Sequence, residues 1–285
     1  MTAAVRELDV AEITAAIKRM CMDANYDLPG DVYRAIEQAA ETEESPVGRA
    51  VLGQLIENAD IARDDRVPIC QDTGLAVLFI DVGQDVHLVG GDFEEAVNDG
   101  VRQGYGEGYL RKSSVREPGH ARVNTKDNTP AIIHARIVPG DQVGIWLMPK
   151  GGGAENMSSL NMLKPAQGAD GIVQAVVDTV SRAGSNPCPP VVIGVGIGGT
   201  IDKVTQLAKK ALLREIGSSH AESRLAAMEA EMLERVNRLG IGPQGLGGTT
   251  TALAVFIEEA PCHIASMPVA VNVQCHAQRH QSVVL

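Results

Sequence analysis

The feature that most constrains the fold is a cysteine placed where a short polar loop meets an apolar run. The stretch Pro68–Gly74 reads PICQDTG, and the apolar run Leu75–Val82 follows it directly. A continuous apolar run bounded by turn residues predicts a buried strand. Cys70 is therefore expected at a junction between a loop and a strand. The three residues after it add an amide, a carboxylate and a hydroxyl to the same loop.

Two other cysteines lie in similar surroundings, Cys188 in the string NPCPP and Cys275 in the string NVQCH. Thiolates are soft ligands that bind zinc, copper(I) and iron–sulfur clusters. Structural zinc sites use close pairs of the C-x-x-C type, and this chain contains no such pair. Electron-transfer clusters usually take four cysteines, so three thiolates would leave one iron open as a Lewis acid. We predict that Cys70, Cys188 and Cys275 meet in the fold and hold one iron–sulfur cluster.

Spacing alone leaves two alternatives open for the cysteines. Free cysteines are often small buried apolar side chains. Cys21 is predicted to be one, because it falls on the apolar stripe of a helix. A nucleophilic Cys70 paired with His263 or His276 is the second alternative.

The composition narrows the class of protein. A chain of 285 residues with 44% apolar residues fits one large domain or two small ones, at roughly 150 residues per domain. The net charge of −11 argues against a nucleic-acid surface, and no segment approaches the ~20 apolar residues of a membrane span. The first eight residues lack the apolar core of a signal peptide. Five cysteines are too few for a disulfide framework. We therefore expect a cytoplasmic protein.

Hydrophobic periodicity predicts a mixed α/β fold in a single domain, residues 1–285, with helices packed around small mixed sheets. Residues 1–65 are expected to form a helical layer, and residues 66–285 the cluster-binding part. Helix starts are predicted at Asp9, Gly30 and Ser45, from capping residues and a proline at the first helical position. Pro139–Asp141 predicts a turn that joins two strands. The predicted strands are 75–82, 86–89, 131–138, 142–148, 191–195 and 251–257, with a strand-like segment 262–275, and the later helices are 93–109, 171–183, 203–216 and 221–239.

Several glycine-rich loops follow predicted strands, which is where ligands bind in α/β folds. Gly151–Gly153 is flanked by Lys, Glu, Asn and Ser, which favours a binding loop over a linker. Gly194–Gly199 matches the dinucleotide pattern G-x-G-x-x-G, but no second strand ending in an acidic residue follows it. Gly240–Thr251 lacks the Gly-Lys-Ser/Thr of a phosphate loop. Arg111–Arg116 is a local cluster of positive charge that is either a solvated loop or an anion site.

Taken together, several separated strings resemble the class I fumarase family, also called the iron–sulfur tartrate dehydratase family. Their order along the chain makes the resemblance far more specific than any one string. They span most of the sequence after residue 66 and are CQDTG at 70–74, NTPA at 128–131, PKGGG at 149–153, ENMS at 155–158, CPP at 188–190, GIGGT at 196–200, and the segments Gly242–Thr251 and His263–His276.

The resemblance implies a [4Fe–4S] cluster, held by the residues at Cys70, Cys188 and Cys275. Cys262 is the nearest rival for the third ligand, and the Gln-Cys-His-Ala context favours Cys275. The reaction implied is reversible addition or removal of water on a small dicarboxylate. The remaining implied roles are substrate contact or proton relay for Gln71 and Asp72, a carboxylate clamp for Arg111, a backbone contact for Gly153, and a place near the substrate, in the proton relay, for His263.

The resemblance also implies a partner. Single-chain members carry a second domain after the region seen here, whereas this chain stops at Leu285. It therefore resembles an alpha subunit that needs a beta subunit in a hetero-oligomer, without nucleic acid or membrane. Fumarate/(S)-malate is the first substrate pair predicted, and L-tartrate is the alternative. The base that removes the proton on the opposite face has no clear candidate. A nucleotide-binding module and a non-catalytic scaffold subunit are the more distant alternatives.

Overall fold

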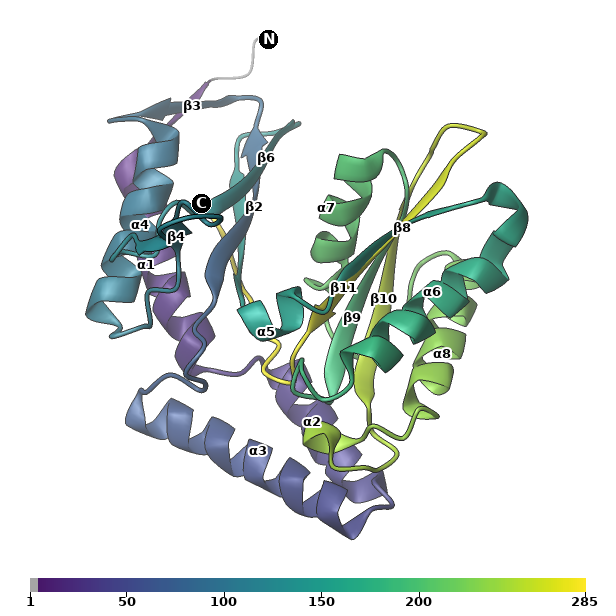
Figure 1. Cartoon of the computed structure of the whole chain (residues 1–285). Helices are drawn as coiled ribbons and strands as arrows, with labels where there is room; N and C mark the ends of the chain where they lie inside the picture. The colour runs from purple at the N-terminus through teal and green to yellow at the C-terminus, as the bar shows by residue number, and fades with distance from the viewer. Residues whose placement is uncertain (1–4) are drawn as a thin grey trace. The chain divides into compact units, whose positions relative to one another are not determined.

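The computed structural model describes residues 5–285 (Figure 1). The chain divides into two compact units. Unit 1 comprises the chain up to Pro29, Ile61–Gly151 and Arg279–Leu285, and unit 2 comprises Gly30–Asp60 and Gly152–Gln278. Both units therefore draw on the predicted helical part, 1–65, and on the predicted cluster-binding part, 66–285. The assignment of the whole chain to one catalytic domain stays a prediction.

Unit 1 is built on a four-stranded sheet with the order β12-β7-β2-β6. The central strand β2 pairs in parallel with β6 and antiparallel with β7. A second, two-stranded sheet joins β1 and β3 in parallel. The elements of unit 1 are β1 (Arg6–Asp9), α1 (Val10–Tyr26), β2 (Leu75–Gly83), β3 (Val86–Val89), α4 (Phe93–Glu107), β4 (Val115–Arg116), β5 (Val123–Asn124), β6 (Ile132–Val138), β7 (Val143–Lys150) and β12 (Gln281–Val284).

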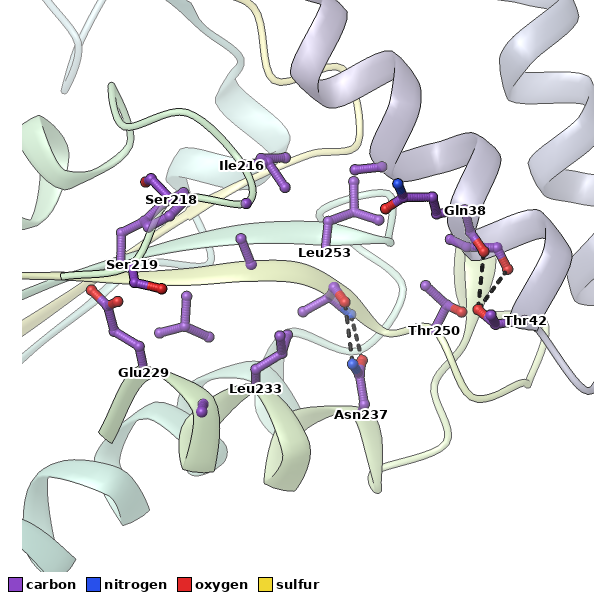
Figure 2. A pocket seen from close by; sticks show the side chains of 18 of the residues that line it. Gln38, Thr42, Ile216, Ser218, Ser219, Glu229, Leu233, Asn237, Thr250 and Leu253 are labelled. Atoms are coloured by element: carbon purple, nitrogen blue, oxygen red, sulfur yellow. Dashed lines mark hydrogen bonds between the residues drawn. The ribbon is translucent and has the colours of Figure 1, made fainter. Parts of the chain in front are cut away.

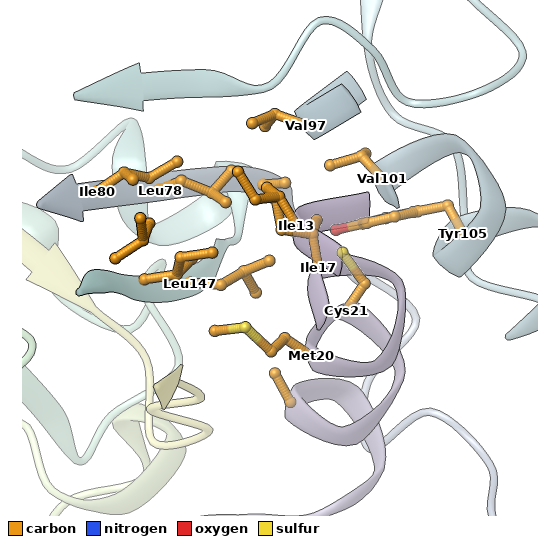
Figure 3. Packing of buried hydrophobic residues seen from close by; sticks show 14 of the residues in the cluster. Ile13, Ile17, Met20, Cys21, Leu78, Ile80, Val97, Val101, Tyr105 and Leu147 are labelled. Atoms are coloured by element: carbon orange, nitrogen blue, oxygen red, sulfur yellow. The ribbon is translucent and has the colours of Figure 1, made fainter. Parts of the chain in front are cut away.

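The core of unit 1 lies between the pair α1 and α4 and the sheet face formed by β2 and β7 (Figure 3). Gly100 and Gly104 allow the two helices to approach closely, because a Cβ at either position would lie 2.8 Å from Ile17 or Cys21 side-chain atoms. Cys21 is fully buried in this core, and burial raises the pKa of its thiol far above the usual value. The prediction that Cys21 is a buried apolar side chain is confirmed.

The structure adds to one expectation for unit 1 and corrects another. Pro139–Asp141 joins two strands as predicted, although these strands, β6 and β7, are not paired with each other because β2 lies between them. The Gly83 N–H at the end of β2 donates to the Gln142 carbonyl at 2.8 Å. The N-terminal part is also not wholly helical, because β1 precedes α1 and pairs with β3. Asp9, at the end of β1, still caps α1 by accepting the Ala11 N–H at 2.9 Å.

Unit 2 is built on a four-stranded sheet with the order β10-β9-β11-β8. Strands β9 and β10 are parallel, and β11 runs antiparallel to both β9 and β8. The division between the units falls inside α3, after Asp60. The elements are α2 (Gly30–Thr42), α3 (Pro46–Asp65), α5 (Gly152–Glu155), β8 (Ser159–Leu163), a 3-10 turn (Pro165–Gln167), α6 (Gly168–Ala183), β9 (Val191–Gly198), α7 (Ile201–Ala211), α8 (Ser223–Asn237), a second 3-10 turn (Pro243–Gly245), β10 (Ala252–Ala260) and β11 (Met267–Gln274).

Successive residues of the buried strand β9 face opposite sides of the sheet, and this alternation explains how the helices of unit 2 cover it. Val191, Ile193 and Val195 face the apolar core shared with α6 and α8. Gly194 and Gly196 face α7, and a Cβ at either position would lie about 2 Å from a carbonyl oxygen of that helix. These glycines of the G-x-G-x-x-G match therefore serve helix–strand packing. The helix α7 also ends at Ala211, five residues earlier than predicted.

The remaining sequence-based elements agree with the structure within a few residues at their ends. Ser45 caps α3 by accepting the Gly48 N–H at 3.1 Å, as the Ser-Pro signal predicts. The class, mixed α/β with small mixed sheets flanked by helices, is confirmed. In residues 5–285, none of the helices is both long and apolar enough to cross a membrane.

We predict that Gly196→Ala lowers the free energy of unfolding by about 1–3 kcal/mol, the usual range for overpacking. The added methyl would lie 2.1 Å from the Val204 carbonyl oxygen, so α7 must move away from β9. Urea denaturation measures the effect. Gly53→Ala is the matched control, because a Cβ there in α3 meets nothing within 4 Å and should stabilise the helix by roughly 0.5–1 kcal/mol. Equal stability of the two variants would contradict this packing role.

Candidate functional site

The Cys70–Gly74 loop of unit 1 folds back on its own cysteine. The Asp72 N–H donates to Cys70 Sγ at 3.4 Å, and the Gly74 N–H donates to Asp72 Oδ1 at 3.0 Å. Cys70 and Asp72 are half-buried, and Gln71 is exposed. Gly74 has a φ of +72°, and a Cβ there would lie 2.6 Å from the Lys150 nitrogen, so this position requires glycine. The loop thus presents a thiol, an amide and a carboxylate from a fixed backbone.

Buried side chains bind the backbone carbonyls of this loop. The Tyr105 hydroxyl lies 2.8 Å from the Thr73 carbonyl oxygen and 3.0 Å from that of Gly74. Burial raises the pKa of Tyr105 well above its usual value, which keeps the hydroxyl protonated as a donor. Arg279 donates to the Asp72 carbonyl oxygen at 2.8 Å. Each of the three loop residues is therefore held by the core of unit 1.

The segment that carries Arg111 is joined to the same loop. The Thr73 hydroxyl donates to the Arg111 carbonyl oxygen at 2.9 Å. Asn128 accepts the Ser113 N–H at 2.7 Å and donates to the Gly74 carbonyl oxygen at 3.1 Å. The Arg111 side chain is exposed, so its guanidinium is available to a ligand. Unit 1 thus brings the Arg111 segment together with two of the strings on which the family resemblance rests, CQDTG and NTPA.

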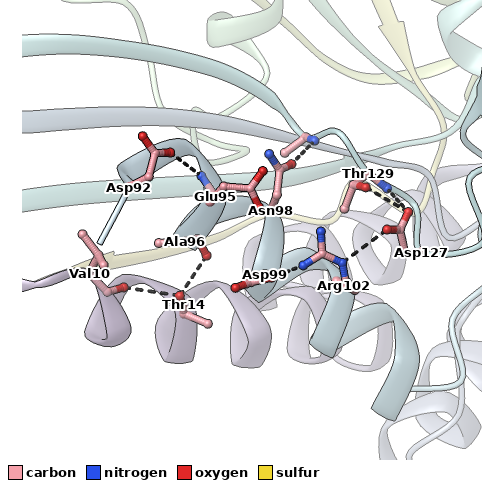
Figure 4. A network of polar contacts seen from close by, with 11 residues as sticks. Val10, Thr14, Asp92, Glu95, Ala96, Asn98, Asp99, Arg102, Asp127 and Thr129 are labelled. Atoms are coloured by element: carbon pink, nitrogen blue, oxygen red, sulfur yellow. Dashed lines mark hydrogen bonds and ion pairs between the residues drawn. The ribbon is translucent and has the colours of Figure 1, made fainter. Parts of the chain in front are cut away.

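A polar network fixes the NTPA string at 128–131 (Figure 4). Asp127 accepts hydrogen bonds from the Thr129 N–H and hydroxyl, at 3.1 and 2.9 Å. Arg102 of α4 reaches Asp127 at 3.3 Å and also pairs with Asp99. Asn98 accepts the Ala131 N–H at 2.9 Å. Helix α4 therefore holds the turn on both sides of the buried Asn128.

In unit 2 the turns that carry Cys188 and Cys275 are hydrogen-bonded to each other. The His276 N–H donates to the Cys188 carbonyl oxygen at 3.3 Å, and His276 Nδ1 lies 3.1 Å from the same oxygen. Cys188 is exposed and Cys275 is half-buried. The structure therefore joins the turns that carry two of the three predicted ligands, within one unit.

Gln244 joins the same two turns, and sequence reasoning missed it. Its backbone N–H and its Nε2 each donate to the Pro189 carbonyl oxygen at 2.8 Å. Nε2 also lies 3.1 Å from His276 Nδ1. The signal available was a glutamine between a proline and a glycine in a glycine-rich loop, which does not reveal a partner 55 residues away.

Gly153 and His263 also lie in unit 2. Gly153 is exposed in the short helix α5, and a Cβ there would lie 3.5 Å from the Asn186 carbonyl oxygen, just before Cys188. His263 is exposed in a turn in which its Nδ1 accepts the Ala265 N–H at 3.1 Å. The neighbouring Cys262 thiol donates to the Ser266 carbonyl oxygen at 3.2 Å.

The predicted site residues therefore divide between the units. Cys70, Gln71, Asp72 and Arg111 belong to unit 1, and Gly153, Cys188, His263 and Cys275 to unit 2. In the described part of the chain, 5–285, no group of three or more His, Cys, Asp or Glu side chains is gathered as ligands of a metal ion. The donor chemistry nevertheless fits an iron–sulfur cluster, because cysteine sulfur is the usual ligand of such clusters and all three cysteines lie in loops. The three-cysteine ligand set stays a prediction.

The amides of the glycine-rich loop Gly242–Thr251 are bound by a carboxylate of the protein itself. Glu43, 1% exposed, accepts the Thr249 N–H at 2.8 Å and the Thr250 N–H at 2.7 Å. It also accepts the Ser45 N–H at 2.9 Å, beside the start of α3. Burial alone would raise the pKa of Glu43, but these N–H donors lower it to about 2. Glu43 thus occupies the loop amides that a nucleotide phosphate would need.

A cavity of about 640 Å³ lies next to this loop in unit 2 (Figure 2). Its lining comes from α2, α8 and β10 and includes Gln38, Leu233, Thr250 and Phe256. None of the predicted site residues lines it. The cavity is therefore separate from the cysteine-bearing turns of unit 2.

We predict that Glu43→Gln destabilises the protein by about 3 kcal/mol at pH 7, because the carboxylate pKa falls from 4.5 to about 2 on folding. A lowered pKa stabilises the fold above pH 4.5 and loses that effect as the pH falls towards 2. The stability difference between wild type and variant should therefore be constant from pH 5 to 8 and shrink below pH 4.5. Denaturant titrations across this range measure it, with the exposed Glu44→Gln as control. A pH-independent difference would contradict the assigned role of Glu43.

Comparison with known proteins adds relatives that cover almost the whole chain. A provisionally named L(+)-tartrate dehydratase subunit alpha from Methanocaldococcus jannaschii is 42% identical over 274 residues, which is 94% of this chain and 95% of that protein. The L(+)-tartrate dehydratase subunit alpha of Escherichia coli strain UTI89 is 31% identical, over 98% of this chain and 92% of that protein. Its counterpart in strain K12 is 30% identical, over 100% of this chain and 94% of that protein.

A family model also matches, and it covers nearly every residue of the chain. The model is described as fumarate hydratase (Fumerase), and it matches residues 14–284. That range contains all of the strings on which the resemblance was based. The chain therefore belongs to the fumarate hydratase (Fumerase) family and is a hydro-lyase.

Proposed function

We propose that this chain is the alpha-type subunit of an L(+)-tartrate dehydratase. The observation that carries the proposal is the identity of 42% over 94% of the chain to a relative with that name. The names of the relatives favour the tartrate alternative over fumarate hydration, which the sequence analysis placed first. Fumarate/(S)-malate is kept as the second candidate because the matching family model is described as fumarate hydratase.

We propose a [4Fe–4S] cluster as the cofactor, with Cys70, Cys188 and Cys275 as its ligands. When bound through three thiolates, such a cluster supplies a Lewis-acidic iron that polarises a hydroxyl group of the substrate. The Asp72 N–H, 3.4 Å from Cys70 Sγ, is placed to donate to a ligating sulfur. Hydrogen bonds of this kind tune iron–sulfur clusters. The hydrogen bond between the Cys188 and Cys275 turns supports a joint role for these two residues.

The chain's own side chains account for binding of the substrate. The exposed Arg111 guanidinium can bind a carboxylate through two parallel hydrogen bonds. Gln71 and the Gly153 N–H offer further donors to the substrate oxygens. Asp72 and His263 are proposed to move protons, and His263 holds its ring proton on Nε2 because Nδ1 is an acceptor. The base on the opposite face has no assigned residue in this chain.

A partner subunit follows from the proposal. The relatives are named subunit alpha, so we propose that a beta subunit completes the active site in a hetero-oligomer. Further basic residues that bind the second carboxylate of the substrate are expected on that subunit. A cytoplasmic location remains the prediction from sequence.

The experiment that tests the proposal is an assay of the anaerobic complex with its partner subunit on L-tartrate, D-tartrate, meso-tartrate, (S)-malate and fumarate. Loss of water from tartrate gives an enol that becomes a keto acid, which can be followed directly. We expect kcat/KM for L-tartrate to exceed that for each other substrate by about tenfold or more. A preference for fumarate or malate would favour the second candidate. No activity on any of the five substrates would contradict both.

We expect Cys70→Ser, Cys188→Ser and Cys275→Ser each to abolish the visible absorbance of the reconstituted cluster and the hydro-lyase activity. The reason is that a cluster held by only two thiolates is lost. Cys262→Ser and Cys21→Ala are the controls, and both should keep cluster and activity. Cys21→Ala should lower stability only modestly, because it truncates a small buried side chain. A cluster that survives Cys275→Ser but not Cys262→Ser would assign the third ligand to Cys262.

A further inference from the structure

The inner side of the Cys70–Gly74 loop contacts polar side chains that are buried in unit 1. Three of them donate to the carbonyl oxygens of three successive loop residues, and the fourth accepts a hydrogen bond from one of the three. None of the four is more than 1% exposed. We call these four residues the loop-holding cluster: Asn25, Tyr105, Asn128 and Arg279.

Arg279 is the unusual member, because its charge is buried and forms no ion pair with any of residues 5–285. Its Nη1 donates to Asn25 Oδ1 at 2.9 Å and its Nη2 to the Asp72 carbonyl oxygen at 2.8 Å. Both acceptors are neutral, and its Nε–H is buried with no acceptor. Burying a charge in this way is costly, and an apolar side chain of similar size would fill the space more favourably. The guanidinium therefore indicates a function beyond filling the core.

The position of the guanidinium shows what that function is. Asp72 uses its N–H towards Cys70 Sγ and one carboxylate oxygen towards the Gly74 N–H. Its carbonyl is bound from the core by Arg279. The direction in which the Asp72 side chain and the Cys70 thiol point is thus coupled to the guanidinium. The same contact places a permanent positive charge against a loop whose proposed ligands are anions.

We infer that Arg279 is a positioning residue that fixes the Cys70–Gly74 loop through the Asp72 carbonyl and gives the loop a preference for an anionic ligand. The inference deepens the proposed function and rests on it where it concerns the dicarboxylate. Its structural part, the fixing of the loop, concerns this chain alone.

The positive charge of Arg279 and the planar shape of its guanidinium contribute differently to this role, and two substitutions separate the contributions. Lysine at this position keeps the positive charge but replaces a planar fork by a single ammonium, so it cannot hold Asn25 and Asp72 in the same geometry. Glutamine removes the charge and keeps one amide donor. Arg279→Lys should therefore retain part of the loop fixing, and Arg279→Gln should retain less of it. A residue that only filled space would show no such order.

The first readout is hydrogen exchange of the full chain without cluster, followed by mass spectrometry. The amides of Asp72 and Gly74 are donors inside the loop, so their exchange reports its order. We expect Arg279→Gln to speed their exchange by about tenfold or more, and Arg279→Lys to do so less, while β9 in unit 2 is unchanged. Unchanged exchange at Asp72 and Gly74 would overturn the inference, as would an equal increase throughout unit 1.

Arg66→Gln is the matched control. Arg66 also lies in unit 1 beside α1, but it is half-exposed and pairs with Asp23 at 2.9 Å and Asp27 at 2.7 Å. Its loss removes one positive charge from the surface and should leave the loop amides unaffected, because exposed ion pairs contribute little. Faster loop exchange in Arg66→Gln, equal to that in Arg279→Gln, would overturn the specific role of the buried guanidinium.

The second readout is steady-state kinetics of the reconstituted complex with its partner subunit. We expect Arg279→Lys to lower kcat for the preferred dicarboxylate by about tenfold or more, with a smaller change in KM, because misplacement of reacting groups acts on the chemical step. Unchanged kcat together with normal exchange would overturn the inference. Altered loop exchange in a complex inactive on every dicarboxylate would instead support loop fixing and contradict the proposed function, so the two failures are distinguishable.

Discussion

The hydrogen bonds that hold the carbonyls of the Cys70–Gly74 loop are the interactions on which the rest of unit 1 depends. A cysteine loop that leads directly into a buried strand leaves backbone groups facing the core, and buried carbonyls must be paired. Here Tyr105 of α4, Asn128 and Arg279 pair them. These residues come from distant parts of the chain, so one loop ties the helix pair, the sheet and the C-terminal segment together.

In unit 2, the glycine-rich loops also carry backbone groups that need hydrogen-bond partners. Such loops expose amides that bind anions, and here the chain supplies its own partners. Glu43 takes the amides of Thr249 and Thr250, and Gln244 joins the Cys188 turn to the Cys275 turn. The glycine-rich strings therefore act as structural connections, which removes the main support for a nucleotide-binding module. In the Cys188 and Cys275 turns, the thiols are the groups suited to binding a cofactor.

Local patterns in the sequence predicted most elements, because hydrophobic periodicity is a local signal. The strand Val86–Val89 has the predicted ends, and Ser45 caps its helix as predicted. The four-residue strand β1 was missed, since its ladder partner β3 lies 80 residues away. Glu43, Gln244 and Arg279 were missed for the same reason: charged and amide side chains are usually exposed, and the positions of these three depend on partners up to 254 residues distant. The three-cysteine ligand set rests on the loop context of each cysteine and on the family resemblance, and it stays a prediction.

The central claim is that this hydro-lyase chain carries an iron–sulfur cluster with one open iron. The most direct test measures iron and acid-labile sulfide per chain in the anaerobic complex with its partner subunit, with an EPR spectrum after mild oxidation. We expect equal amounts of iron and sulfide, about four of each per chain, and a three-iron signal once the labile iron is lost. Absence of iron after anaerobic reconstitution with the partner subunit would contradict it.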